Sequence, residues 1–131
     1  MRVVADSHAI FWHLQRSPKL SAPAAQALRE AGTREIVVSV ATLVDLWYVT
    51  QTTQAITTAD LALVRAALEV SARVDLRVID AAVADAYTAI PRSVLRDPWD
   101  RFIVATAHAL EAPLVTRDAA IQKAQLVQTI W

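Results

Sequence analysis

The stretch VVADSHAIFWHL, residues 3–14, joins an apolar run to a helical pattern through a single acidic residue. Residues 2–5 carry adjacent valines and predict a short buried strand. Residues 7–15 have the apolar spacing of a helix, which the serine–proline pair at 17–18 ends. A strand that passes directly into a helix is typical of a β/α unit, so this stretch predicts a parallel sheet with Asp6 at the junction.

The same alternation of short apolar runs and helical patterns continues along the chain. Further strands are expected at 35–39, 76–79, 113–116 and 126–129, and further helices at 21–31, 40–50, 58–72, 80–90, 97–110 and after Asp118. Gly32, the only glycine, lies where the cap of the second helix is expected. This pattern favours an α/β fold with a central, mostly parallel, four- to five-stranded sheet covered on both faces. No repeat or linker interrupts the sequence, so we expect one domain over residues 1–131.

The overall composition excludes several classes of protein. Apolar residues make up 55% of the chain and charged residues 20%, which favours a folded core over disorder. The absence of cysteine excludes disulfides, zinc–thiolate sites and thiol catalysis. Thirteen basic residues balance thirteen acidic ones, so nucleic-acid binding through a bulk positive field is excluded, whereas a local basic patch is not. Neither a signal-peptide pattern nor a membrane-length apolar run is present, so we expect a cytoplasmic protein without a membrane partner.

Four acidic residues lie where helices are expected to begin. Asp6, Asp97 and Asp118 are suitable N-caps, and Asp100 has the spacing of the acid in a capping box. A carboxylate is also favourable near a helix N-terminus because of the helix dipole. Helix capping therefore explains each of these residues when it is considered alone.

The same acids suggest a second role when they are considered together. The carboxyl ends of parallel strands line one edge of a sheet, and Asp6 and Asp118 are expected there. Asp97 and Asp100 are three residues apart and share a helix face. Asp45 lies inside an apolar helical pattern and cannot be a cap, so it needs solvent, an arginine or a metal ion as its partner. The local sequence leaves these three alternatives open.

A cluster of carboxylates without cysteine or a histidine pair favours a hard cation, Mg²⁺ or Mn²⁺. Such a cation can lower the pKa of a bound water and stabilise charge on a phosphoryl group. Hydrolysis of phosphodiester bonds is therefore the chemistry that the acidic residues predict.

Four segments resemble the motifs of PIN-domain ribonucleases, most closely the VapC-type toxins of type II toxin–antitoxin systems. They are VVADSHAIFWHL, SVATLVDLW, DPWDRFIVATA and LVTRD, which follow the family's order and span nearly the whole chain. The resemblance implies a three-layer α/β/α fold and a metal-dependent endoribonuclease that cleaves RNA. It also implies a homodimer and a cognate antitoxin protein that blocks the site.

Carried onto this sequence, the resemblance implies catalytic acids at Asp6, Asp45, Asp100 and Asp118. Asp6, Asp100 and Asp118 are expected to bind the metal directly. Asp45 stands where the family usually has glutamate, so its shorter side chain must lie closer in or reach the metal through water. Residues expected beside these acids are Asp97, Ser7 and Thr116, and arginines expected to contact RNA phosphates or to pair with the acids are Arg96, Arg101 and Arg117.

Two other functions are compatible with parts of the sequence. The replacement of glutamate by Asp45 suggests a PIN-like module that binds RNA or protein with a weakened active site. A phosphatase or a receiver domain ranks last. His8 stands where a dehalogenase-type phosphatase needs a second aspartate, and Lys19 and Lys123 are poorly placed for the lysine of a receiver.

Overall fold

Five parallel strands form one sheet in the computed structural model, which describes Met1 to Trp131. The strands are β1 (Val3–Ala5), β2 (Ile36–Ser39), β3 (Val74–Arg77), β4 (Leu114–Val115) and β5 (Thr129–Ile130). Their order across the sheet is β3-β2-β1-β4-β5, so β1 is the central strand. The acid that follows β1 therefore lies at the middle of the sheet's carboxyl edge.

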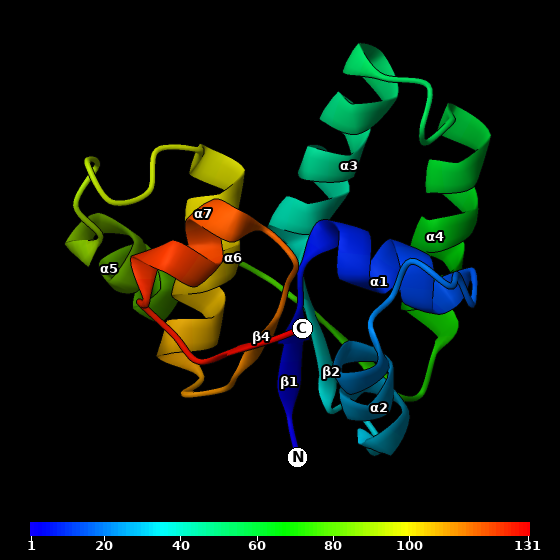
Figure 1. Cartoon of the computed structure of the whole chain (residues 1–131), viewed down its shortest axis with the longest axis horizontal. Helices are drawn as coiled ribbons and strands as arrows, with labels where there is room; N and C mark the ends of the chain where they lie inside the picture. Colours follow the sequence, from blue (N-terminus) through cyan, green and yellow to red (C-terminus); the bar gives the residue numbers. More distant parts are fainter.

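Seven helices cover the sheet. They are α1 (Ser7–Leu14), α2 (Ala22–Glu30), α3 (Val40–Thr52), α4 (Thr58–Val70), α5 (Ala81–Ala89), α6 (Pro98–Ala109) and α7 (Ala119–Ala124). Figure 1 shows α5, α6 and α7 on one side of the strands and α1, α2 and α4 on the other. None of these helices combines the length and the apolar content that a membrane span requires.

Alternation along β1 explains the three layers. Val3 and Ala5 belong to a core cluster that includes Ile10 of α1 and Leu28 of α2. Val4, between them, belongs to a second cluster. Because successive side chains of a strand point to opposite faces, one short apolar strand contributes to both cores.

The second cluster packs the other face of the sheet against α6 and α7. Ile103 of α6 and Ile121 of α7 join Val4 there, and all three side chains are almost completely buried. The α/β/α architecture with a parallel sheet is thereby confirmed.

Two strands lie outside their predicted limits. The strand expected at 76–79 begins two residues earlier, because β3 pairs with β2 from Val74 opposite Ile36. The apolar residues Val78 and Ile79 favoured a strand at 76–79 in the sequence, but their side chains are 67% and 39% exposed. The strand expected at 126–129 is only Thr129–Ile130, since residues 126 and 127 pack against the second core instead.

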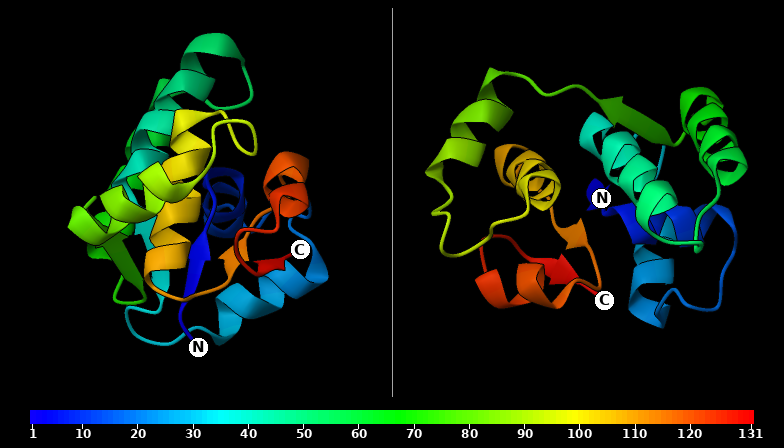
Figure 2. Two further views of the ribbon diagram at one scale, coloured as in Figure 1. Left: turned by 90° about the vertical axis from the view of Figure 1, so that its left-hand side faces the viewer. Right: turned by 90° about the horizontal axis from the view of Figure 1, so that it is seen from above.

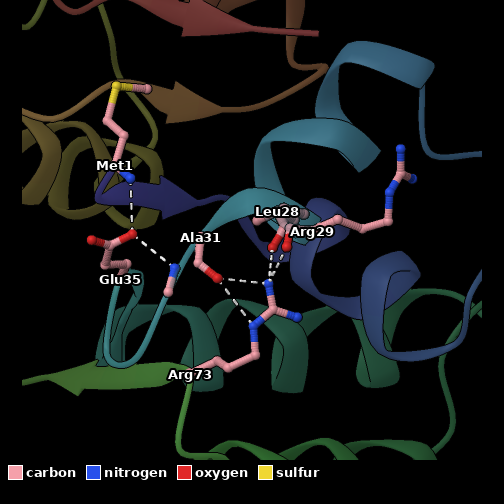
Figure 3. A network of polar contacts seen from close by, with 7 residues as sticks. Met1, Leu28, Arg29, Ala31, Glu35 and Arg73 are labelled. Atoms are coloured by element: carbon pink, nitrogen blue, oxygen red, sulfur yellow. Dashed lines mark hydrogen bonds and ion pairs between the residues drawn. The ribbon is translucent and has the colours of Figure 1, made fainter.

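The side chain of Arg73, rather than Gly32, satisfies the carbonyl groups at the C-terminus of α2. Ala31 is the C-cap in an extended conformation, and the glycine does not adopt a positive φ. Figure 3 shows the guanidinium of Arg73 against the free carbonyls of this helix end. Its Nη2 donates to the carbonyl oxygens of Leu28, Arg29 and Ala31, and its Nε donates again to Ala31. A positive charge at a helix C-terminus is also favourable to the dipole.

A carboxylate fixes the turn that follows this helix. Glu35 accepts hydrogen bonds from the backbone N–H of Gly32 at 2.7 Å and from the amino group of Met1 at 2.8 Å (Figure 3). The bond from the amino group is the main reason that the pKa of Glu35 is lowered. These contacts connect the segment before β2 to the start of β1.

Candidate metal centre

An acidic pocket of about 440 Å³ opens at the carboxyl edge of the sheet. Half of its lining residues are aspartates, and the full set is Asp6, His8, Asp45, Val49, Asp100, Arg117, Asp118 and Ala119. The right-hand panel of Figure 2 looks down on this edge, where α1, α3 and α6 lie around the central strand. The edge of the sheet at which the acidic residues were expected therefore contains a pocket that they line.

Asp6 is buried at the bottom of the pocket, with 7% of its surface exposed. Its Oδ1 accepts from the backbone N–H of Ser7 at 2.7 Å, which caps α1. Its Oδ2 accepts from the hydroxyl of Thr116 at 2.6 Å. One donor on each oxygen fixes the orientation of the carboxylate, and Thr116 lies beside the acid as the resemblance implied.

Asp45 points from the second turn of α3 toward the same pocket. The hydroxyl of Ser7 donates to its Oδ2 at 2.6 Å. No arginine or lysine forms an ion pair with Asp45, so the structure removes one of the three partners that the sequence left open. This acid within a helix is explained by the pocket that it faces.

Asp100 lies in the first turn of α6 without a hydrogen-bond donor. Asp97 caps this helix and accepts from the backbone N–H groups of Trp99 and Asp100 at 2.9 and 3.0 Å. The carboxylate of Asp100 does not return a bond to Asp97, so the capping-box role suggested by the spacing is wrong. Its oxygens are left free to face the other acids.

Asp6, Asp45 and Asp100 form the carboxylate triad. Each offers one oxygen, and the three oxygens lie within 4.8 Å of one another. The residues come from the end of β1, from α3 and from α6, so only the folded chain brings them together. Carboxylate oxygens at this spacing are a donor set that suits Mg²⁺ or Mn²⁺.

The electrostatics of the triad are unfavourable without a counter-charge. Burial is the main cause that raises the pKa of all three aspartates, and the neighbouring acids raise them further. The pKa of Asp100 rises to about 8, since no hydrogen bond offsets its burial and its repulsion from Asp97 and Asp6. At neutral pH such a group is mostly protonated, and a bound cation would favour its ionised form.

Asp118 lies beside the triad and lines the same pocket. The resemblance implies a direct metal ligand here and an Asp45 that lies closer in or reaches the metal through water. The structure brings an oxygen of Asp45 within 4.8 Å of those of Asp6 and Asp100. The Oδ1 of Asp118 accepts from the backbone N–H of Ile121 at 2.9 Å and caps α7. Asp118 still lines the pocket, and its charge contributes to the raised pKa of each triad member.

The three predicted arginines have different positions. Arg117 lines the pocket, and its guanidinium carbon lies 4.9 Å from the ring centre of Trp12. Arg96 is exposed on the loop before α6 and does not line the pocket.

The structure corrects the expectation for Arg101. This residue is only 5% exposed, and its guanidinium donates to the carbonyl oxygens of Leu95, Tyr87 and Ile90 at 2.7, 2.9 and 2.7 Å. A buried guanidinium with these partners holds the backbone of the α5–α6 connection, so a phosphate contact is wrong for it.

Two apolar residues of the pocket were not anticipated. Val49 follows Asp45 by one helical turn, and Ala119 follows Asp118 directly. Helical periodicity would have placed Val49 on the face of Asp45, because residues four apart lie on one face. The nearby Trp12 is 7% exposed and forms part of the core.

The triad predicts how the stability of the metal-free protein depends on pH. The pKa of Asp100 is about 8 in the folded chain, against 3.8 for an unperturbed aspartate. Between these values the unfolded chain releases a proton that the folded chain keeps, so stability falls as the pH rises from about 4 to about 8. Asp6 and Asp45 shift in the same direction.

Thermal unfolding in EDTA at several pH values measures this slope. We expect the melting temperature of the wild type to fall through this range and that of Asp100→Asn to fall less. Equal slopes for the two proteins would contradict the assignment of the raised pKa to Asp100.

Comparison with known proteins identifies the family. Residues 3–126 match the family model described as "PIN domain", whereas no curated protein sequence matches at a significant level. VapBC2 from Rickettsia felis has a TM-score of 0.69 at 16% identity, with 98% of this chain and 97% of that chain covered. FitAcB from Neisseria gonorrhoeae has a TM-score of 0.64 at 22% identity, with 97% and 95% covered. The chain belongs to the PIN-domain family.

Proposed function

We propose that this chain is a Mg²⁺- or Mn²⁺-dependent endoribonuclease that hydrolyses RNA phosphodiester bonds as the toxin of a VapC-type pair. The carboxylate triad carries this proposal. Three acids from remote parts of the chain converge within 4.8 Å in an open pocket, without a basic side chain paired to any of them. Such an arrangement costs stability and is favourable once a cation is bound.

The residues of the pocket have distinct roles in this proposal. Asp6, Asp45 and Asp100 would hold the cation. When bound, it would supply a water of lowered pKa and positive charge beside the phosphodiester. The hydroxyls of Ser7 and Thr116 keep two of these acids oriented, at 2.6 Å each. Asp97 acts less directly, since it caps α6 and so fixes the turn that carries the third acid.

Arg117 is the residue that we place against the substrate. It is exposed at the pocket, stacks on Trp12 and forms no ion pair with the aspartates around it. A planar guanidinium with free N–H groups suits a phosphate oxygen. A phosphodiester held there would face the triad, and Asp118 would form the adjacent wall.

Protein partners belong to the same proposal. The chain resembles in fold VapBC2 from Rickettsia felis, whose structure is described as VapBC2 "bound to a DNA fragment from their promoter". Large apolar side chains remain exposed on α3 and α4, among them Trp47 at 45% and Leu63 at 70%. Exposed apolar groups of this size support protein interfaces, here a homodimer and a cognate antitoxin.

The alternative of a binding module with a weakened site has less support. It was motivated by Asp45, which is one methylene shorter than the glutamate usual in the family. The carboxylate of Asp45 nevertheless reaches Asp6 and Asp100, so the shorter side chain does not open the triad.

RNA cleavage with and without Mg²⁺ tests the proposed function. We expect cleavage of single-stranded RNA in Mg²⁺, its loss in EDTA and its return when Mg²⁺ is restored. Cleavage that continues unchanged in EDTA, or none at all in either Mg²⁺ or Mn²⁺, would contradict the proposal.

Replacement of Ser7 by alanine tests the support of the triad. Ser7→Ala removes the donor to Asp45 without removing a carboxylate, and we expect about 10- to 100-fold weaker Mn²⁺ binding. Calorimetric titration measures this change. Ser21→Ala is the matched control, because its hydroxyl caps α2 outside the acidic pocket. Equal Mn²⁺ affinity in both variants would show that the hydroxyl of Ser7 is unimportant for the site.

A further inference from the structure

A second, basic cavity lies on the loop that leads into α6. Its volume is about 310 Å³, and its only lining residues are Arg92, Ser93 and Arg96. All three are exposed, and neither arginine forms an ion pair or a side-chain hydrogen bond. Two guanidinium groups thus share a concavity with a hydroxyl and without an acid, which leaves their donors available to an anion.

The loop that carries these residues is held in place from beneath. Buried Arg101 donates to the carbonyls of Ile90, two residues before Arg92, and of Leu95, directly before Arg96. Within the loop, the backbone N–H of Val94 donates to the carbonyl of Pro91 at 3.0 Å. A fixed loop loses little backbone entropy on binding, so only the side chains of the two exposed arginines would have to become ordered around a ligand.

The basic cavity lies near the acidic pocket. Arg96 directly precedes Asp97, the cap of α6, and is four residues from Asp100. Four residues span at most about 14 Å, so the cavity lies within a few nucleotides of a phosphodiester at the triad. Figure 1 and the right-hand panel of Figure 2 both show this yellow-green loop beside the beginning of α6.

The charge balance indicates which ligand fits. The chain is neutral overall and its pocket is acidic, so a polyanion needs local cations to remain near the triad. An acidic protein segment is the competing ligand, but the cavity has no hydrophobic lining residue, whereas the core of a protein interface is usually apolar.

We propose that Arg92, Ser93 and Arg96 form a phosphate-binding subsite that holds the RNA backbone a few nucleotides from the scissile bond. This inference rests on the proposed function, because it takes RNA as the substrate of the adjacent pocket. It adds a contact outside the acidic pocket, so that the enzyme would bind an RNA strand longer than the dinucleotide it cleaves.

Binding of a short labelled single-stranded RNA in EDTA tests the subsite without requiring catalysis. We expect Arg92→Ala/Arg96→Ala to bind about tenfold more weakly than the wild type. Loss of two phosphate contacts should also reduce the slope of log K against log salt by about 1.4. The control is Arg29→Ala/Arg65→Ala, which removes the same charge from exposed positions on α2 and α4.

The outcomes separate the subsite from the proposed function. A loss of RNA affinity no greater than that of the control would overturn the subsite. So would a loss confined to a polyglutamate peptide, because the cavity would then be a protein-docking site. Cleavage by the wild type in Mg²⁺ is measured separately, and its absence contradicts the endoribonuclease proposal while leaving the binding result interpretable.

Discussion

Asp100→Asn is expected to reduce Mg²⁺-dependent RNA cleavage by about 10³-fold or more, equivalent to about 4 kcal/mol of transition-state stabilisation. The reason is the position of its carboxylate, within 4.8 Å of Asp6 and Asp45 and without a hydrogen-bond donor. Asparagine has nearly the same size but lacks the negative charge that holds a cation. Single-turnover cleavage in saturating RNA measures the loss.

The same substitution should stabilise the metal-free protein. The pKa of Asp100 is raised to about 8 by burial and by neighbouring acids, so its ionised form is unfavourable in the folded chain. Removing that charge should raise the melting temperature in EDTA at pH 8 by a few degrees. Opposite effects on activity and stability distinguish a functional acid from one that supports the fold.

Asp85→Asn provides the control for both measurements. Asp85 is exposed on α5, and its carboxylate lies outside the acidic pocket. We expect this variant to cleave RNA like the wild type. Its free energy of unfolding should lie within about 0.5 kcal/mol of the wild-type value. Wild-type cleavage by Asp100→Asn, with the control behaving as expected, would remove this acid from the active site.

Arg101→Met is expected to lower the free energy of unfolding by about 3–5 kcal/mol, a large fraction of the stability of a domain of this size. The substitution keeps much of the apolar length of the side chain. It leaves the carbonyls of Leu95 and Ile90 without the donor that now serves them, whereas the carbonyl of Tyr87 keeps the backbone N–H of Ile90 at 3.2 Å. Each buried carbonyl without a partner costs about 1–3 kcal/mol.

Urea denaturation of Arg101→Met and of Arg96→Met makes this comparison. Arg96 is exposed and forms no hydrogen bond through its side chain, so its replacement should change stability by less than about 0.5 kcal/mol. A loss below about 1 kcal/mol in Arg101→Met would mean that water or a rearranged loop satisfies the carbonyls of Leu95 and Ile90.

The fold followed from the sequence where local chemistry determined it. The valines of β1, the acid at its end and the helical spacing from Ser7 onward together specified a β/α unit. The register of β3 was not determined locally, because Val78 and Ile79 are as apolar as Val74 and Leu76, whereas the other two residues that pair with β2 are charged. Pairing with Ile36 through Ser39 sets that strand, and such a contact between distant segments leaves no local pattern.

The candidate site shows the same division between local and long-range determinants. Asp6 and Asp118 were predicted at one edge of the sheet because parallel strands end there, and each of them caps the helix that follows it. Single residues could not show which acids face one another. Asp45 lies in the triad and Asp118 beside it because of how α3 and α7 pack, and that long-range packing is not written in the sequence around either acid.

Arg101 illustrates a limit of charge-based reasoning. Its neighbour Asp100 lines the pocket, and proximity in sequence suggested a phosphate contact. On a helix, adjacent residues point about 100° apart, so one residue can face the pocket while the next faces the core. The burial of a guanidinium depends on carbonyls from another element, which the sequence pattern around Arg101 does not contain.

Calorimetric titration of the chain with Mn²⁺ is the most direct test of the claim that three carboxylates form a site for a hard cation. Saturable binding to the wild type is expected, with an affinity that increases from pH 6 to pH 8 as the cation displaces the proton of Asp100. The variants Asp45→Asn and Asp100→Asn should lose that binding. The absence of binding to the wild type at millimolar Mn²⁺, or wild-type affinity in both variants, would contradict the metal centre.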